Sequence, residues 1–351
     1  MRFRTTTDSK RTLAAAAICF VAAQVLFNVV ADLRHPELFD AEYGVRLALL
    51  RERQAETPRS PLLLMLGSSR TVHCFEPEIL PELRTAAGAR VLSFNFSHLA
   101  AGPVMNLMEY RRLRRAGVRP SWLVMEVMPP CLSLEKPGQA TGCATALDLP
   151  VLQRYFERPK LFARFCQYRL LPWHRHRNDL VHRFAPDWAA PGSPTEKSTI
   201  HLGPLGGDDH WVMRATETAD CFQRAKEAAR ADYYPRLQDF SIKESTTRAY
   251  GELIATCHKD GTQVVLLLTP EGTEFRSWYS ADALRQIDDW CATMRRTYGV
   301  QIVDARTWVA DGDFLDTHHV MCHGADVFTK RFCEEVLVPL VRGETNWTDG
   351  R

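Results

Sequence analysis

The sequence contains no CxxC pair, although it has ten cysteines, and none of their spacings is typical of a zinc site. Net charge is also nearly absent, because 44 Lys and Arg residues against 42 Asp and Glu residues leave only +2. Such a balance creates no field that favours nucleic acid, and we expect no nucleic-acid partner. No internal repeat or low-complexity tract occurs. With 351 residues, the chain is long enough for one large α/β domain with insertions or for two small domains.

Charge is missing altogether from residues 12–31. As a helix, this segment would be about 30 Å long, which is roughly the thickness of the hydrocarbon core of a bilayer. We interpret it as a transmembrane signal-anchor helix. A cleaved signal peptide is the alternative, although its apolar region is usually shorter than this segment.

Positive charge is concentrated on one side of this segment. Arg2, Arg4, Lys10 and Arg11 precede it, whereas residues 32–42 are acidic on balance. The positive-inside rule then predicts a cytoplasmic N-terminus. We therefore expect a single-pass protein of the cytoplasmic membrane whose folded domain is extracytoplasmic.

The rest of the chain alternates between two hydrophobic patterns. Short apolar runs typical of buried strands occur at 62–66, 90–96, 121–128, 264–268 and 301–303. Helical spacing occurs at 100–117, 245–258, 281–297 and 325–341. This order predicts a flavodoxin-like three-layer α/β/α sandwich with a parallel five-stranded sheet.

The same patterns, together with charge and the Pro and Gly clusters, predict the domain boundaries. They are a cytoplasmic N-terminus at 1–11, the transmembrane helix at 12–31, a juxtamembrane stalk at 32–60, the α/β domain at 61–342 and a C-terminal tail at 343–351. Inside the α/β domain, residues of about 131–240 break the alternation. We expect them to form an insertion or a cap over the site.

A Gly67-Ser68-Ser69-Arg70 turn directly follows the first apolar run. Such a turn lies at the carboxyl edge of a parallel sheet, where open α/β folds place their sites. The helix that follows would offer backbone N–H groups to an oxyanion. We therefore predict that Ser69 is a nucleophile. The alternative is a simple helix cap, and Ser68 is the neighbouring candidate for either role.

A carboxylate and an imidazole lie three residues apart near the C-terminus, at Asp316 and His319. This spacing allows Asp316 to hold one tautomer of His319 while the other ring nitrogen faces a serine. The pair follows the last predicted strand, so it would emerge at the same edge of the sheet as the predicted nucleophile. Two alternatives remain open. One is an N-cap beside a surface imidazole, and the other is a metal cluster with His318, Cys322 and His323.

These motifs resemble those of the SGNH/GDSL hydrolase superfamily, in particular a membrane-anchored branch with Gly-Ser-Ser-Arg in place of Gly-Asp-Ser-Leu. The resemblance implies that Ser69 is the nucleophile and that Asp316 and His319 are its orienter and base. It also implies an oxyanion hole formed by the backbone N–H groups of Ser69 and Gly102. The segment around Gly324 is similar to the family's last block.

One block of the family pattern is missing. Where the resemblance requires Gly-x-Asn-Asp after the third strand, the sequence reads Glu126-Val-Met-Pro-Pro. That asparagine supplies an oxyanion donor, and losing such a donor costs on the order of 3 kcal/mol of transition-state stabilisation. Arg70, His98 and Asn95 are the candidates to replace it.

The resemblance and the apolar segment together imply a membrane-anchored serine acyl esterase or O-acyltransferase that uses no cofactor. Its implied partners are a cell-envelope glycan or related acyl-ester substrate, the membrane and, for transfer, a membrane-bound acyl-donor protein. One rival is a catalytically inactive scaffold or binding component of an envelope-assembly complex, which the missing asparagine favours. The other is a metal-dependent hydrolase that uses His318, His319 and His323.

Overall fold

The computed structural model describes residues 6–35, 38–134, 137–156, 163, 165–166, 169, 177–188, 202–207 and 219–344. These residues belong to two compact units. The first comprises Met1–Val45 and Thr141–Ile200, and the second comprises Arg46–Ala140 and His201–Arg351. Parts of the predicted insertion and of both predicted terminal segments lie outside the described residues.

Five short strands form one parallel sheet in the second unit, in the order β2-β1-β3-β4-β5. They are β1 (Leu62–Leu66), β2 (Leu92–Asn95), β3 (Trp122–Glu126), β4 (Gln263–Leu268) and β5 (Gln301–Asp304). Leu64 on β1 lies opposite Phe94 on one side and Leu123 on the other. Nearly every residue of the first four strands is buried. Their continuous apolar runs therefore match a parallel sheet with helices on both faces.

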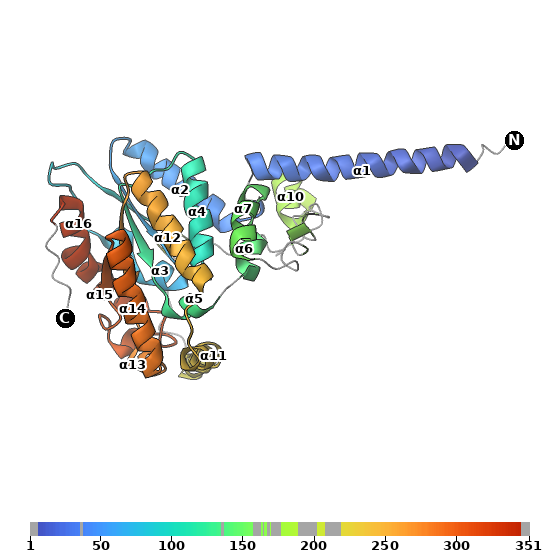
Figure 1. Ribbon diagram of the computed structural model, residues 1–351. Helices are drawn as coiled ribbons and strands as arrows, with labels where there is room; N and C mark the ends of the chain where they lie inside the picture. Colours follow the sequence, from blue (N-terminus) through green and yellow to red (C-terminus); the bar gives the residue numbers. More distant parts are fainter. Residues whose placement is uncertain are drawn as a thin grey trace. The chain divides into compact units, whose positions relative to one another are not determined.

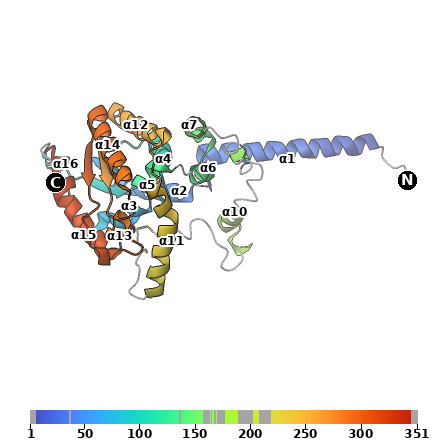
Figure 2. The same cartoon turned by 60° about the horizontal axis from the view of Figure 1, so that its bottom comes forward.

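Helices form a layer on each face of the sheet (Figures 1 and 2). In one layer, α4 (Pro103–Arg115) and α14 (Ala281–Tyr298) both pack against α12 (Glu244–Lys259). In the other, α3 (Ser69–Cys74) packs against α15 (Cys322–Phe332). The predicted fold class, a parallel five-stranded α/β fold, is thereby confirmed.

Alternation along β1 decides which side chains meet which layer. Leu63 and Met65 share a core cluster with Phe75, which follows α3, and with Phe328 and Phe332 on α15. The last two rings are stacked, with centroids 5.3 Å apart. This cluster fixes the turn at the end of β1 relative to the C-terminal helix.

The final helix predicted at 325–341 is divided into three parts. After α15, a π-helical turn covers Cys333–Leu337, and α16 (Val338–Arg342) follows. Pro339 lies in the first turn of α16 and has no N–H to donate to the preceding turn. The regular hydrogen-bond ladder is therefore interrupted where the sequence pattern predicted one helix.

Further α-helices are described besides these. They are α2 (Ala41–Glu56), α5 (Pro129–Ser133), α6 (Pro137–Cys143), α7 (Leu149–Tyr155), α10 (Arg177–Phe184), α11 (Ala219–Gln238) and α13 (Thr273–Arg276). Arg46 on α2 is buried, and its Nη1 donates to the carbonyl oxygens of Asn95 at 2.9 Å and Gly206 at 2.8 Å.

Helix α1 (Thr6–Arg34) belongs to the first unit. Among the described residues, its segment Ser9–Arg34 is the one helical stretch long and apolar enough to cross a membrane. Near its end, Asn28 donates to the carbonyl of Arg169 at 2.9 Å, and Arg169 pairs with Asp32 at 2.6 Å. A membrane anchor and a signal sequence both have this length and composition, so the helix fits both sequence-based interpretations.

Candidate active site

The predicted nucleophile lies at the carboxyl end of β1. Gly67 follows the strand, Ser68 is the N-cap of α3, and Ser69 is the first residue of that helix. The Oγ of Ser68 accepts a hydrogen bond from the backbone N–H of Arg70 at 3.3 Å, and its side chain is buried. Ser69 is only partly buried. Ser68 thus takes the capping role, and the hydroxyl of Ser69 is the one that the turn presents at the edge of the sheet.

Ser69, His319 and Asp316 lie together in the second unit. The Oγ of Ser69 is 2.8 Å from Nε2 of His319, and Nδ1 of the same ring is 2.7 Å from Oδ2 of Asp316. The other carboxylate oxygen, Oδ1, accepts the backbone N–H of His319 at 2.8 Å. An acceptor at Nδ1 places the imidazole proton there, which leaves Nε2 to accept the proton of the serine.

A short antiparallel bridge between Phe314 and Val320 closes the turn that carries the imidazole and the carboxylate, which we call the histidine turn. Thr317, in the middle of this turn, has a φ of 84°, in the left-handed region that residues other than glycine seldom adopt. Such a conformation costs on the order of 1–3 kcal/mol and persists where its surroundings fix it. Here the carbonyl of Thr317 accepts the N–H of Gly272 at 2.8 Å, which ties the turn to the loop after β4.

The ionisation of Asp316 suits its place beside an imidazole. Burial alone would raise the pKa of this carboxyl, but the hydrogen bond from His319 and the electrostatic attraction between these two groups outweigh burial. They hold the pKa of Asp316 well below its ordinary value. The carboxylate therefore stays ionised at neutral pH and stabilises a positive charge that forms on His319.

A second imidazole packs against the first. The ring centroids of His318 and His319 are 4.2 Å apart, and His318 also contacts Phe275 at 5.3 Å and Tyr233 at 5.0 Å. Burial, together with the nearby charge of His319, holds the pKa of His318 well below its ordinary value. This ring is therefore neutral near pH 7. The sequence did not distinguish it from an exposed histidine, because nothing local marks its burial.

Metal binding was the alternative use of these side chains. The ligand atoms of Asp316, His318 and His319 lie within 4.8 Å of one another. His323 is not in this group, because its Nδ1 lies 2.9 Å from Asp313 and its side chain is 76% exposed. Both ring nitrogens of His319 already face partners, one a serine and the other a carboxylate. The arrangement therefore suits proton transfer from a serine better than it suits metal binding.

A buried acid begins the segment where the third block of the family pattern is missing. The carboxylate of Glu126, at the end of β3, accepts the backbone N–H of Ser68 and also its hydroxyl, the latter at 3.1 Å. It accepts the hydroxyl of Thr71 at 3.0 Å as well. Both oxygens of this carboxyl accept hydrogen bonds in the turn after β1, so Glu126 fixes that turn and is not directed as a donor at an oxyanion. This role could not be predicted from the sequence, because the residues that Glu126 contacts follow a different strand, β1.

The two predicted oxyanion-hole residues lie at helix starts that follow neighbouring strands. Ser69 begins α3 and Gly102 is the N-cap of α4. Helix geometry leaves the N–H groups at such positions without a partner in their own helix. Of the candidates for the missing donor, Asn95 is committed elsewhere, because its Nδ2 donates to the carbonyls of Thr71 and Phe75.

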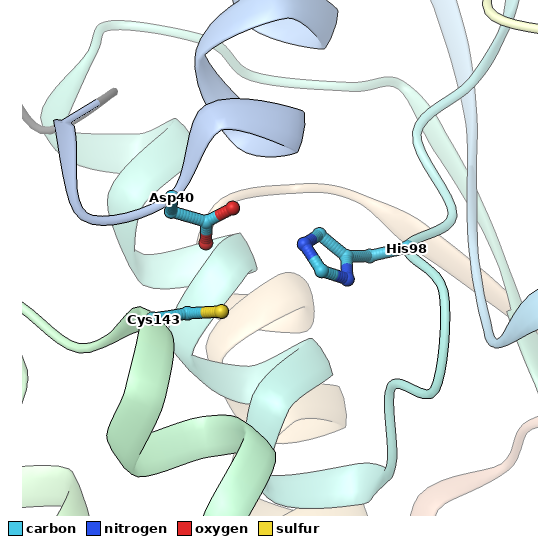
Figure 3. Close-up of side chains that lie close together, drawn as sticks. All are labelled: Asp40, His98 and Cys143. Carbon is cyan, nitrogen blue, oxygen red and sulfur yellow. The ribbon is translucent and has the colours of Figure 1, made fainter. Parts of the chain in front are cut away.

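His98 is a further candidate and lies in the loop after β2 (Figure 3). Its Nδ1 is 2.9 Å from the carbonyl oxygen of Leu99. Figure 3 also labels Asp40 and Cys143, which belong to the first unit and whose carboxylate and thiol lie within 4.8 Å of each other. Two ligands of this kind are fewer than the four of a structural zinc site, so we assign no metal to them.

Comparison with known proteins leaves the function open. No family model and no curated protein matches the chain. Among solved structures, one that is similar is a Bacteroides fragilis protein proposed to be an acylhydrolase, with a TM-score of 0.37 and 10% sequence identity over 84% of this chain and 98% of that one. A likeness this low carries no argument for a shared activity, so the functional argument rests on the geometry of the site.

Proposed function

We propose that this protein is a serine-dependent carboxylic-ester hydrolase or acyltransferase. One observation supports the proposal most strongly: two consecutive contacts, of 2.8 and 2.7 Å, join Ser69 to His319 and His319 to Asp316. Acyl transfer needs a nucleophile, a base and an orienter in this order. Ser69 and His319 are 250 positions apart, so helix capping and local packing do not account for their contact.

In the proposed reaction, Nε2 of His319 takes the proton of Ser69 while Oγ forms a bond to the carbonyl carbon of an ester. The N–H groups of Ser69 and Gly102 stabilise the oxyanion. The carbon–oxygen bond to the alcohol then breaks, and the alcohol leaves with the proton from His319. In the second half, a water or a sugar hydroxyl gives its proton to His319 and attacks the acyl-serine. The bond between the acyl carbon and Oγ then breaks, Oγ takes the proton back from His319, and the acid or the new ester leaves.

As the substrate class, we propose a cell-envelope glycan or a related acyl ester. The apolar helix α1 is consistent with a membrane anchor, and the motifs around Ser69 and His319 resemble those of a membrane-anchored SGNH/GDSL branch. In this proposal the N-terminus is cytoplasmic, the sheet domain is extracytoplasmic, and a membrane-bound protein donates the acyl group if the reaction is transfer.

Ester turnover by the full chain in detergent micelles tests this proposal. With p-nitrophenyl acetate as the probe, Ser69→Ala and His319→Ala should reduce the rate to the background without enzyme. Ser277→Ala is the matched control, because it removes an exposed hydroxyl that donates to the carbonyl of Glu274, and should retain the rate. Equal rates in the parent and in Ser69→Ala would contradict the proposal.

A catalytically inactive scaffold in an envelope-assembly complex is the second candidate. It is favoured by the missing asparagine of the third block, because Glu126 in the same segment accepts hydrogen bonds and does not replace the lost donor. In that case the folded parent protein should turn over no ester and should not react at Ser69 with an electrophilic probe.

A further inference from the structure

Arg70, the residue after the proposed nucleophile, is an ion-paired cation inside the protein. Its Nη1 lies 2.9 Å from Oε1 of Glu271, with side-chain exposures of 2% and 0%. The hydroxyl of Tyr279 donates to the same oxygen at 2.7 Å. Burial alone would lower the pKa of Arg70, but the neighbouring acidic groups, Glu271 first, outweigh burial and raise it. The guanidinium therefore carries a permanent charge.

Glu271 belongs to the loop that supports the histidine turn. The next residue, Gly272, donates its N–H to the carbonyl of Thr317, which is the strained residue of that turn. A Cβ on Gly272 would lie 3.0 Å from this oxygen, so the two backbones approach closely. The ion pair between Arg70 and Glu271 thus ties the helix that carries the serine to the turn that carries the imidazole.

A series of ring contacts makes a second connection between the same two segments. The guanidinium carbon of Arg70 lies 4.6 Å from the ring centroid of Phe275. The Phe275 ring is 5.3 Å from that of His318, which in turn is 4.2 Å from that of His319. Side chains are therefore in continuous contact from Arg70 to the proposed base.

The ion pair is poorly explained by stability alone. Among the described residues, Nε and Nη2 of Arg70 and Oε2 of Glu271 are buried without a hydrogen-bond partner. Apolar residues of similar size often replace a buried ion pair without loss of stability, because removing the charges also removes their desolvation penalty. A role in the geometry of the site accounts for the pair better.

We infer that Arg70 is a positioning residue, which acts through Glu271 and Phe275 to hold the histidine turn where the imidazole can take the proton of Ser69. This inference rests on the proposed function, because it gives Arg70 a role only in the reaction of Ser69. Removing Arg70 and Glu271 together removes one charge of each sign, so it tests the position of the histidine turn and not a change of net charge beside the imidazoles.

The experiment measures how fast a fluorophosphonate probe modifies Ser69 in the full chain in micelles, as a function of pH. The double variant Arg70→Met/Glu271→Leu removes both charges together and leaves no unpaired ion. We expect it to stay folded, because the lost desolvation penalty of the two charges offsets the lost acceptor of Tyr279. We expect its labelling rate to fall about tenfold or more, as small misplacements of reacting groups cause. The fall should be of similar size across the pH range, because the two removed charges have opposite signs, whereas Arg70→Lys should keep most of the parent's rate.

The matched control is Arg111→Met/Glu252→Leu, which removes the same two charges from an ion pair between α4 and α12. It should leave the rate and the pH dependence unchanged. If the parent is labelled and Arg70→Met/Glu271→Leu behaves in the same way, the inference is wrong although the proposed function stands. A parent that is not labelled at Ser69 would instead overturn the proposed function. Should the double variant fail to fold, Glu271→Gln decides, since a labelling rate equal to the parent's would overturn the inference.

Discussion

Glu126 accepts hydrogen bonds from both the backbone N–H and the hydroxyl of Ser68, the residue before the proposed nucleophile. Its carboxylate also accepts the hydroxyls of Thr71, at 3.0 Å, and Thr269, at 3.4 Å. Because β3 is the direct neighbour of β1, one side chain at the end of β3 fixes the turn at the end of β1. The position of Ser69 therefore depends on Glu126, although Glu126 takes no part in the proposed reaction.

Replacing Glu126 by alanine should lower the free energy of unfolding by about 3 kcal/mol, because several buried donors lose their acceptor and a cavity remains. Urea denaturation of the full chain measures this loss. Glu335→Gln is the control, since Glu335 is half exposed and pairs with Arg331 at the surface, where such pairs contribute about 1 kcal/mol or less. A similar, small effect in both variants would show that the carboxylate of Glu126 does not hold the turn.

Gly67 should not tolerate a side chain. A Cβ at this position would lie 2.2 Å from Oγ1 of Thr71 and 2.6 Å from Oε2 of Glu126. Gly67→Ala should therefore destabilise the protein by about 1–3 kcal/mol, as overpacking does. It should also slow ester turnover, because the neighbouring Ser69 must shift. Gly312→Ala is the control, because no atom lies within 4 Å of the Cβ that it adds. Thermal unfolding compares the two, and equal midpoints would count against the close packing of this turn.

His318 should make the protein less stable in mild acid. It stays neutral in the folded state, whereas an unfolded histidine has a pKa of about 6.5. Below that pH the unfolded chain binds a proton that the folded protein does not bind, so stability falls as the pH falls. Between pH 7 and pH 5 this effect has an upper limit of about 2 kcal/mol, which it reaches if the folded protein binds no proton there.

His318→Phe removes the titrating group and keeps a ring to pack against Phe275 and Tyr233. Its loss of stability between these two pH values should be smaller than that of the parent by the same amount, as urea denaturation at each pH would measure. A parent and a His318→Phe variant with the same pH dependence would show that His318 takes up its proton in the folded protein as it does in the unfolded chain.

The strands could be predicted from the sequence, and so could the proximity of Ser69 and His319. The apolar runs are long and regular, and the carboxyl ends of parallel strands share one edge of the sheet. The contacts of Glu126 and the ion-pair partner of Arg70 could not be predicted from the sequence. These contacts join residues 55 and 201 positions apart, and no local pattern encodes them. The π-helical turn in the last helix could not be predicted either, because hydrophobic spacing continues through Pro339.

The most direct test of the proposed chemistry is mass spectrometry of the full chain after treatment with a fluorophosphonate, which reacts with activated serines. We predict an adduct on Ser69 that is absent from Ser69→Ala and at least about a hundredfold slower to form in His319→Ala, because the base no longer takes the proton. Folded protein whose Ser69 stays unmodified, although a small fluorophosphonate reaches the site, would contradict the assignment of Ser69 as a nucleophile.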